Sequence, residues 1–178
     1  MPTASCASFV VVAILPIRFY PDGILTKPAE PVRQWNHTLF QLIDDLIETL
    51  HDQPGGIGIA APQVGGSVRV IVIHVPKKKD GRGLHVLINP KVVSASGQLI
   101  GREGCMSLPD FTGNVLRSEK IEVEALERQG EVVRFTSTGL EAVCLQHEID
   151  HLNGLTFIHR VNSLKTDIFR RKRYLKKK

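Results

Sequence analysis

The sequence predicts an α+β fold in which antiparallel β-sheets pack around one central helix. That helix carries an H-E-x-x-H motif, and we expect an amphipathic helix nearer the N-terminus and another helix at the C-terminus. The prediction rests on an early amphipathic pattern, on short β-branched segments with tight connections, and on a single helical pattern late in the chain. This order favours antiparallel sheets over the strand–helix alternation of a doubly wound parallel sheet.

The first helix is predicted to begin at Asn36, after an irregular segment rich in proline. Polar residues occupy one face of the helix, and apolar residues recur at helical spacing on the other, at Leu39, Leu42, Ile43, Leu46, Ile47 and Leu50. The sequence Pro54-Gly55-Gly56 then ends the helix. We interpret this helix as structural.

Strands are predicted where β-branched residues cluster between turn residues. These segments are 68–75, 84–88, 92–93, 121–126 and 132–135. The lysine-rich loop 76–83 joins the first two and is expected to be solvated. The late helix is predicted to begin at Thr138, because Thr138 and Glu141 have the spacing of a capping box. Asn153-Gly154 supplies its end.

The composition is that of one globular domain. The chain has 178 residues, of which 42% are hydrophobic and 23% charged, and these values exclude collagen-like, low-complexity and disordered classes. No apolar run approaches the length of about 18 to 20 residues that spans a bilayer. The longest, residues 9–17, is not preceded by a Lys or Arg, so a secretory signal is not expected. We expect a soluble protein that is not exported.

The net charge of +5 is concentrated at the C-terminus, where residues 170–178 hold seven basic side chains. The rest of the chain is therefore slightly acidic. We divide the chain into an extension at 1–14, which can join the first strand, a catalytic domain at 15–168 and a basic tail at 169–178. The tail is either a solvated end or a contact for a phosphate-rich partner. Three cysteines (6, 105 and 144) indicate a reducing compartment.

His147, Glu148 and His151 form the H-E-x-x-H motif. Residues i and i+4 lie on one face of a helix, so the two imidazoles could bind a single metal ion. Glu148 could then reach a water molecule at the ion without being a ligand itself. The alternative is a pair of histidines on the surface of an amphipathic helix.

A catalytic metal site of this kind takes three protein ligands, so one more is needed. Phe157 stands where a metzincin has its third histidine. No glutamate follows Glu148, and His159 lies beyond the predicted end of the helix. The third ligand is therefore expected upstream.

Two cysteines compete for this role. Cys144 is seven residues from His151, about 10 Å along a helix axis, and is better interpreted as a small packing residue. Cys105 in REGCMSLP is favoured as the ligand, a free buried thiol being the alternative. Two histidines and one thiolate suit Zn²⁺ or Fe²⁺, which would polarise a carbonyl and activate water. With Glu148 as the proton carrier, the predicted reaction is amide hydrolysis.

The segment GIGIAAPQVGG (56–66) is rich in glycine but does not fit a phosphate-binding loop, since it lacks G-K-[ST] and precedes a strand. We therefore expect no nucleotide ligand. Its small residues would let a peptide backbone approach closely. The amide of Gln63 could stabilise an oxyanion, and the alternative is an ordinary exposed loop residue.

Taken together, GIGIAAPQ (56–63), EGCMS (103–107) and QHEIDH (146–151) resemble the three signature motifs of the peptide deformylase family. The resemblance covers about residues 14–170. It implies a cytoplasmic bacterial enzyme that removes the formyl group from N-formyl-methionyl nascent polypeptides and releases formate. The ion implied is Fe²⁺, replaceable by Zn²⁺, Ni²⁺ or Co²⁺. No membrane partner is expected.

The resemblance also implies roles for single residues. Three would hold the metal, namely Cys105, His147 and His151, and Glu148 would be the general acid and base. The side chain of Gln63 and the backbone N–H of Met106 would stabilise the oxyanion. The backbone around Gly58 and Gly104 would hold the nascent chain. The methionine side chain would lie among Ile57, Leu140, Val143 and Cys144.

This chain departs from the family pattern at three places. Thr112 stands where many members have an arginine, although Arg117 matches a second arginine of the pattern. Met106 replaces the commoner leucine, and the first dozen residues have no counterpart. Because family members can dock at the ribosome through a C-terminal helix, the basic tail is a candidate contact for ribosomal RNA. The rival interpretations are an H-E-x-x-H endopeptidase and a metal-stabilised RNA-binding protein.

Overall fold

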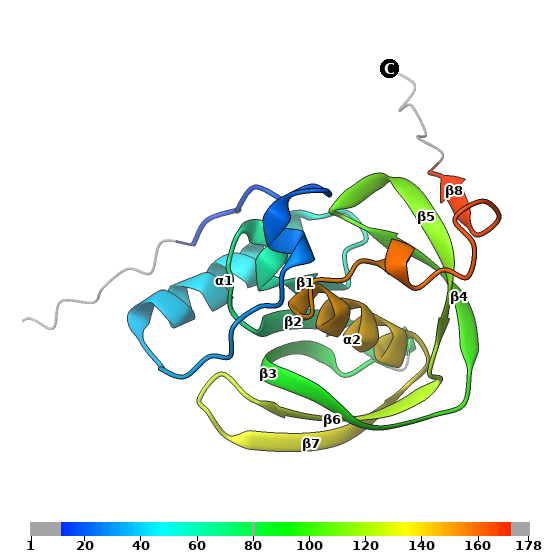
Figure 1. Ribbon diagram of the computed structural model, residues 1–178. Coiled ribbons are helices and arrows are strands. Elements are labelled where there is room, and N and C mark those ends of the chain that lie inside the picture. The colour runs from blue at the N-terminus through cyan, green and yellow to red at the C-terminus, as the bar shows by residue number, and fades with distance from the viewer. Residues whose placement is uncertain (1–11, 80, 172–178) are drawn as a thin grey trace, which may run out of the picture.

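The strands form two antiparallel sheets, and the two α-helices pack on opposite faces of the larger one (Figure 1). The computed structural model describes residues 12–79 and 81–171. The larger sheet has the strand order β1-β2-β3-β6-β7 and the smaller has the order β4-β5-β8.

Eight strands and two α-helices are found in the described residues. The strands are β1 (Gly58–Ala60), β2 (Val70–Val75), β3 (Gly83–Ser96), β4 (Leu99–Cys105), β5 (Leu108–Arg117), β6 (Lys120–Leu126), β7 (Val132–Thr138) and β8 (Ile168–Arg170). The helices are α1 (His37–Asp52) and α2 (Gly139–Leu152). Short 3-10 turns lie at Gly23–Thr26, Ala61–Val64, Lys77–Lys79 and Phe157–His159.

Strand β2 shows how the core is organised. Successive side chains of a strand point to opposite faces of the sheet. Val70 and Val72 belong to the apolar cluster that contains Leu46 of α1, whereas Ile71 and Ile73 belong to the cluster that contains Leu145 of α2. A strand buried on both faces needs a continuous apolar sequence, which explains the β-branched run VIVIHV.

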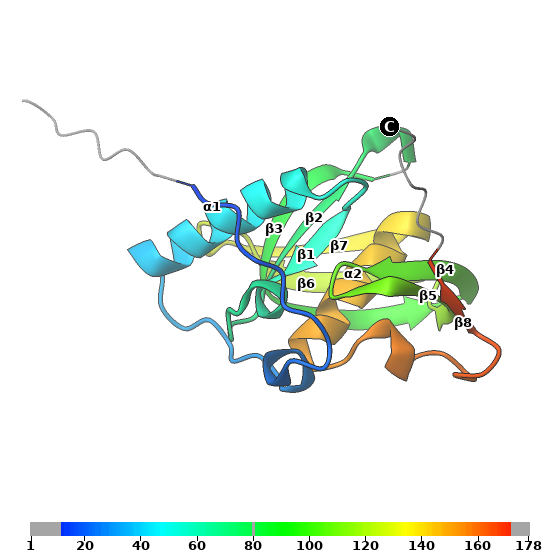
Figure 2. The ribbon, with the colours of Figure 1, turned by 90° about the horizontal axis from the view of Figure 1, so that it is seen from above.

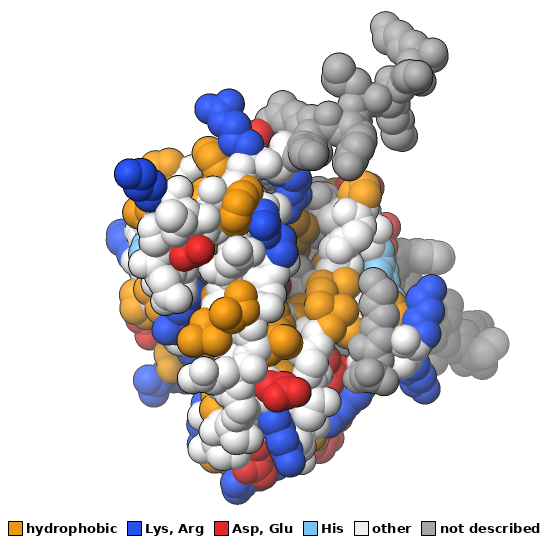
Figure 3. Space-filling model, turned by 90° about the vertical axis from the view of Figure 1, so that its right-hand side faces the viewer, with side chains coloured by type: hydrophobic (Ala, Val, Ile, Leu, Met, Phe, Trp, Pro, Cys, Tyr) orange, Lys and Arg blue, Asp and Glu red, His pale blue; other side chains and the backbone are white. Residues whose placement is uncertain are grey.

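Helix α2 lies between the two sheets (Figure 2). One side of it packs on the large sheet, and the other side meets the small sheet through Cys105–His151 and Arg117–Asp150 contacts. The outer face of the small sheet is exposed. Figure 3 shows this side of the molecule, where hydrophobic side chains gather near the middle of the face; the large exposed ones of β4 and β5 are Leu99, Ile100, Phe111 and Leu116.

Both predicted α-helices of the domain are present. Helix α1 begins after Asn36, whose side chain accepts a hydrogen bond from the N–H of Leu39. Helix α2 ends at Leu152, with Asn153 as its C-cap residue, followed by Gly154 with a φ of 74°. The prediction of a capping box at Thr138 was wrong, because the side chain of Thr138 makes no capping hydrogen bond. Glu141 instead accepts hydrogen bonds from Ser137 Oγ and from the backbone N–H of Arg82.

The strand prediction was incomplete. The segments 84–88 and 92–93 are parts of one long strand, β3, which is bent by register shifts near Asn89, a residue with a φ of 52°. Strands β4 and β5 were not predicted, and Cys105 is the last residue of β4. The pattern missed both strands because they contain Gly, Pro and charged residues that are uncommon in strands.

The predicted C-terminal helix is not found in the described residues. After α2 these residues contain the 3-10 turn Phe157–His159 and strand β8, which pairs with β5. Pairing with an open sheet edge therefore determines the conformation of 168–170. The predictions for residues 1–11 and 172–178 lie outside the described residues. No helix of the described chain is long and apolar enough to cross a membrane.

Candidate metal centre

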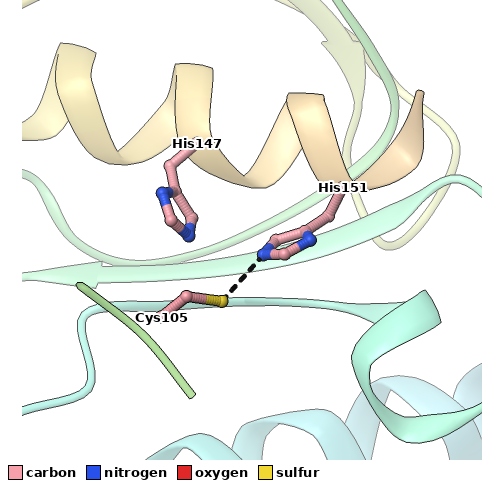
Figure 4. Close-up of side chains that lie close together, drawn as sticks. All are labelled: Cys105, His147 and His151. Carbon is pink, nitrogen blue, oxygen red and sulfur yellow. Dashed lines mark hydrogen bonds between the residues drawn. The ribbon is translucent and has the colours of Figure 1, made fainter. Parts of the chain in front are cut away.

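Cys105, His147 and His151 form a compact group of three potential metal ligands. One ligand atom from each lies within 4.8 Å of the others, and all three side chains are buried. Cys105 Sγ lies 3.2 Å from His151 Nε2. Figure 4 shows both imidazoles, one turn apart on α2, on the side of the helix that faces the cysteine. The end of β4 and the C-terminal half of α2 thus meet at this group.

The donor set fits a divalent cation. The ligand atoms of a tetrahedral ion bound at about 2.0–2.3 Å lie about 3.5 Å apart. The separation of 3.2 Å between Cys105 Sγ and His151 Nε2 is close to this value. Nδ1 of His147 is occupied by Glu103 Oε2 at 2.8 Å, which leaves Nε2 as the ligand atom of that ring. Glu103 is buried and accepts hydrogen bonds from Arg117, so it holds the ring in a fixed orientation.

The electrostatics of the group also favour a cation. Burial raises the pKa of the Cys105 thiol, but the adjacent imidazoles, above all the charge of His151, outweigh burial and hold the pKa well below its usual range. Burial lowers the pKa of His147, but the thiol and Glu103 outweigh it and raise that pKa well above its usual value. A buried imidazole has a raised pKa only where the surrounding electrostatic potential is negative. A bound divalent cation would neutralise that potential.

Glu148 lies beside this group and is fully enclosed. Burial raises its pKa to about 7, and the nearby imidazoles only partly offset this effect. Its Oε2 atom is buried and has no hydrogen-bond partner within the described part of the chain. A carboxyl group with a pKa near neutrality can both accept and release a proton at physiological pH.

Gln63 is buried, so the alternative of an exposed loop residue does not hold. Its Oε1 accepts a hydrogen bond from the N–H of Ala60, and this bond fixes the orientation of the amide. The Nε2 group donates to Ser107 Oγ at 3.3 Å and lies 3.5 Å from Cys105 Sγ. An amide donor is thus aimed at the candidate metal site.

A cavity of about 590 Å³ opens onto this group. The predicted site residues that line it are Ile57, Gly58, Gln63, Gly104, Cys105, Met106, Leu140, Val143, Cys144, His147 and Glu148. His151 lies behind the cavity wall and is fully buried. Cys144 is not part of the ligand group, since its Sγ donates to the carbonyl of Ile57 at 3.4 Å.

Sequence reasoning missed the network of charges behind the site. Arg117 is buried and binds both Glu103 and Asp150, and Asp150 also accepts hydrogen bonds from Arg160. The chain of contacts therefore runs from the surface at Arg160 to His147. The signal in the sequence is that Glu103 and Cys105 are two residues apart. On a strand this spacing places both side chains on one face, which here is the face toward α2.

Comparisons with known proteins agree with this site. Residues 14–167 match the family profile of polypeptide deformylase. Peptide deformylase from Thermodesulfovibrio yellowstonii is 44% identical over 93% of this chain and 99% of its own length. The crystal structure of a peptide deformylase from Legionella pneumophila has a TM-score of 0.79 and 42% identity, covering 86% of this chain and 89% of that one.

A third relative was solved with a peptide. The Met-Ala-Ser-bound structure of a class I type b peptide deformylase from Acinetobacter baumannii has a TM-score of 0.78 and 37% identity, and covers 85% of this chain and all of that chain. The extent of these matches, together with the Cys–His–His group, shows the family. The chain belongs to the polypeptide deformylases, metal-dependent hydrolases that remove the N-formyl group from nascent peptides.

Proposed function

We propose that Cys105, His147 and His151 together bind one divalent cation, Fe²⁺ in the cell, and that the surrounding residues hydrolyse the formamide of N-formyl-methionyl chains. The observation that carries the proposal is the convergence of three buried ligand atoms within 4.8 Å, beside the carboxyl group of Glu148. Zn²⁺, Ni²⁺ and Co²⁺ suit the same mixture of imidazole and thiolate ligands. When bound, the ion would supply Lewis acidity, lowering the pKa of water and polarising the formyl carbonyl.

Glu148 would move the proton. It takes a proton from the attacking water and delivers it to the nitrogen of the methionine as the carbon–nitrogen bond breaks, so that formate and a free amine are released. Its raised pKa of about 7 supports both steps, because the carboxyl group exchanges protons readily near neutral pH. The enclosed position of its side chain also limits competing contact with solvent.

Gln63 and Met106 would stabilise the negative charge that develops on the formyl oxygen. The amide of Gln63 is held in place by Ala60, and its Nε2 group points towards Cys105. Met106 follows Cys105 directly and lines the cavity, so its backbone N–H is the second proposed donor. A preorganised donor is effective because it needs no reorientation as the charge forms.

The apolar part of the cavity would accept the methionine side chain. Ile57, Leu140, Val143 and Cys144 line it, and Cys144 is fixed by its hydrogen bond to Ile57. Gly58 and Gly104 both line the cavity, and the backbone around them would hold the nascent chain in an extended pose. The peptide bound by the Acinetobacter relative begins with methionine, which supports this use of the cavity.

We further propose that residues 15–168 form the catalytic domain, that the enzyme acts in the reducing cytoplasm, and that the basic tail contacts ribosomal RNA. The support for the tail contact is its run of lysines and arginines, which suits phosphate groups. Deleting residues 172–178 should weaken co-sedimentation with ribosomes in a salt-dependent manner. Unchanged co-sedimentation would refute the tail contact and leave the catalytic proposal intact.

The direct test of the catalytic proposal is formate release from formyl-Met-Ala-Ser by protein purified without oxygen, with the metal content measured on the same sample. The variant Glu148→Ala should keep its metal and its fold but lose turnover. Cleavage of internal bonds in an unformylated peptide, without formate release, would favour an endopeptidase. Retention of full formate release by Glu148→Ala would exclude Glu148 as the proton carrier.

A further inference from the structure

The outer part of the catalytic cavity carries two exposed guanidinium groups. Arg102 of β4 and Arg171, which follows β8, both line it. The carboxylates that line the same cavity are Glu103 and Glu148. Both are buried, and Glu103 is already bound to Arg117 and His147. Among the described residues that line the cavity, the exposed charges are therefore positive.

Arg171 lies directly against the strand that carries Cys105. Its backbone N–H donates to the carbonyl of Asp110 at 2.8 Å, which fixes the chain beyond β8 at the sheet edge. Nη2 of Arg171 lies where a Cβ atom of residue 104 would stand, so the guanidinium packs against the bare backbone of Gly104. The position of such a Cβ atom on residue 104 lies 3.5 Å from Cγ2 of Thr112, which is the β5 partner of Gly104. The short side chain of Thr112 leaves this space to Arg171.

Arg102 is held in place by neutral groups. Its Nε donates to Asn114 Oδ1 at 2.9 Å and its Nη1 to Thr112 Oγ1 at 3.3 Å. Its guanidinium also stacks over the ring of Phe169, 3.5 Å from the centroid. Among the residues that the structure describes, neither Arg102 nor Arg171 forms an ion pair with a carboxylate. Both groups are thus positioned, and their charge is available to a ligand.

We propose that Arg171, with Arg102, selects nascent chains that carry acidic side chains at the two positions after the formyl-methionine. This proposal rests on the proposed function, because the methionine must occupy the apolar part of the cavity. The residues after it must then pass the edge of β4, where Gly104 and the two arginines lie. A guanidinium binds a carboxylate through two parallel hydrogen bonds, whereas a lysine side chain at the same place would be repelled.

The test compares three peptides with amidated C-termini, formyl-Met followed by two glutamates, two glutamines or two lysines. The amide removes the terminal carboxylate, which would otherwise bind the same arginines. The unmodified protein should hydrolyse the glutamate peptide with a kcat/KM about two- to fivefold above that of the lysine peptide, the size expected for an exposed ion pair. High salt should reduce the ratio.

Arg171→Gln should bring this ratio close to one, and Arg171→Lys, which keeps the charge, should retain part of it. Arg170→Gln is the matched control, since Arg170 is the last residue of β8, directly before Arg171, but does not line the cavity, and it should leave the ratio unchanged. The proposal is overturned if the unmodified protein shows no charge preference, or if the preference survives in the Arg102→Gln/Arg171→Gln double variant. Hydrolysis of none of the three peptides would instead count against the proposed function itself.

Discussion

Oε2 of Glu103 lies 2.8 Å from Nδ1 of His147, and Arg117 donates two hydrogen bonds to the same carboxylate. One ring nitrogen of the metal ligand is therefore fixed by a buried ion pair, which leaves the other to face Cys105. The position of His147 depends on β4 and β5 as much as on its own helix. Loss of these contacts should change the metal affinity, the stability and the pH dependence of the stability, and each effect can be measured separately.

Replacing Glu103 with alanine should weaken metal binding by about 10- to 100-fold, because loss of the outer partner frees the imidazole. The affinity can be measured by competition with a chromogenic chelator. Glu103→Gln should lose less, since its amide oxygen can still accept a hydrogen bond from His147. Equal affinities for the alanine variant and the unmodified protein would show that the contact does not position the ligand.

Replacing Arg117 with methionine should lower the free energy of unfolding by about 3 kcal/mol or more, because two buried carboxylates lose their shared partner. Those carboxylates belong to Glu103 and Asp150. Arg134→Met is the matched control: its ion pair with Glu122 is exposed, and the free energy of unfolding should barely change. Urea unfolding of both variants checks the prediction, and equal losses would contradict it.

Acid should destabilise the metal-free protein through Glu103. Burial raises the pKa of Glu103, but Arg117 and His147 outweigh it and lower the pKa from 4.5 to about 2. The unfolded chain thus binds the proton at a higher pH than the folded chain. The stabilisation is complete above the ordinary pKa and is lost as the pH falls towards the lowered one. As the pH falls from 4.5 to about 2, the free energy of unfolding of the metal-free protein should decrease more steeply than that of the metal-free Glu103→Gln variant.

The parts of the fold that the sequence predicted are those determined by local pattern. The apolar positions of α1 repeat at helical spacing, and β2 is a β-branched run that is buried on both faces. Strands β4 and β5 lack such a pattern. Glu103 and Arg117 lie on the buried face of these two strands, whereas the sequence pattern predicts that charged residues are exposed to solvent. They are buried because they pair with each other and with His147 and Asp150, which belong to a distant helix.

Strand β8 was not predicted for a related reason. Ile168, Phe169 and Arg170 have no periodic pattern, and they form a strand because β5 offers an open edge at Phe111–Gly113. The position of Arg171 follows from that pairing, so no local signal could have placed it in the cavity. The motif residues on α2 were predictable because helical spacing alone puts His147 and His151 on one face.

Cys105→Ser should lose most of its metal, because a serine hydroxyl is a poor replacement for a thiolate ligand. Cys144→Ser should keep its metal, since the Cys144 side chain donates to the carbonyl of Ile57 and a hydroxyl can do the same. Metal content per chain, measured after purification without oxygen, separates the two variants. Loss of metal from both would imply that Cys144 supports the site more directly than its contacts indicate.

Gly58 brings β1 into close contact with the catalytic helix. A Cβ atom at this position would lie 2.7 Å from both Cys144 Sγ and Glu148 Oε1, far inside normal contact distances. Gly58→Ala should therefore cost about 1–3 kcal/mol of stability and displace the carboxyl group of Glu148. Formate release should fall by more than the loss of folded protein accounts for.

Gly101→Ala in β4 is the control for this variant, because a Cβ atom there meets no other atom within 4 Å. Adding Cys144→Ala to Gly58→Ala removes one of the two collisions and leaves the other. The double variant should regain part of its stability, measured by urea unfolding, but little of its turnover, because Glu148 remains displaced. Recovery of both together would mean that Gly58 acts only through packing against Cys144.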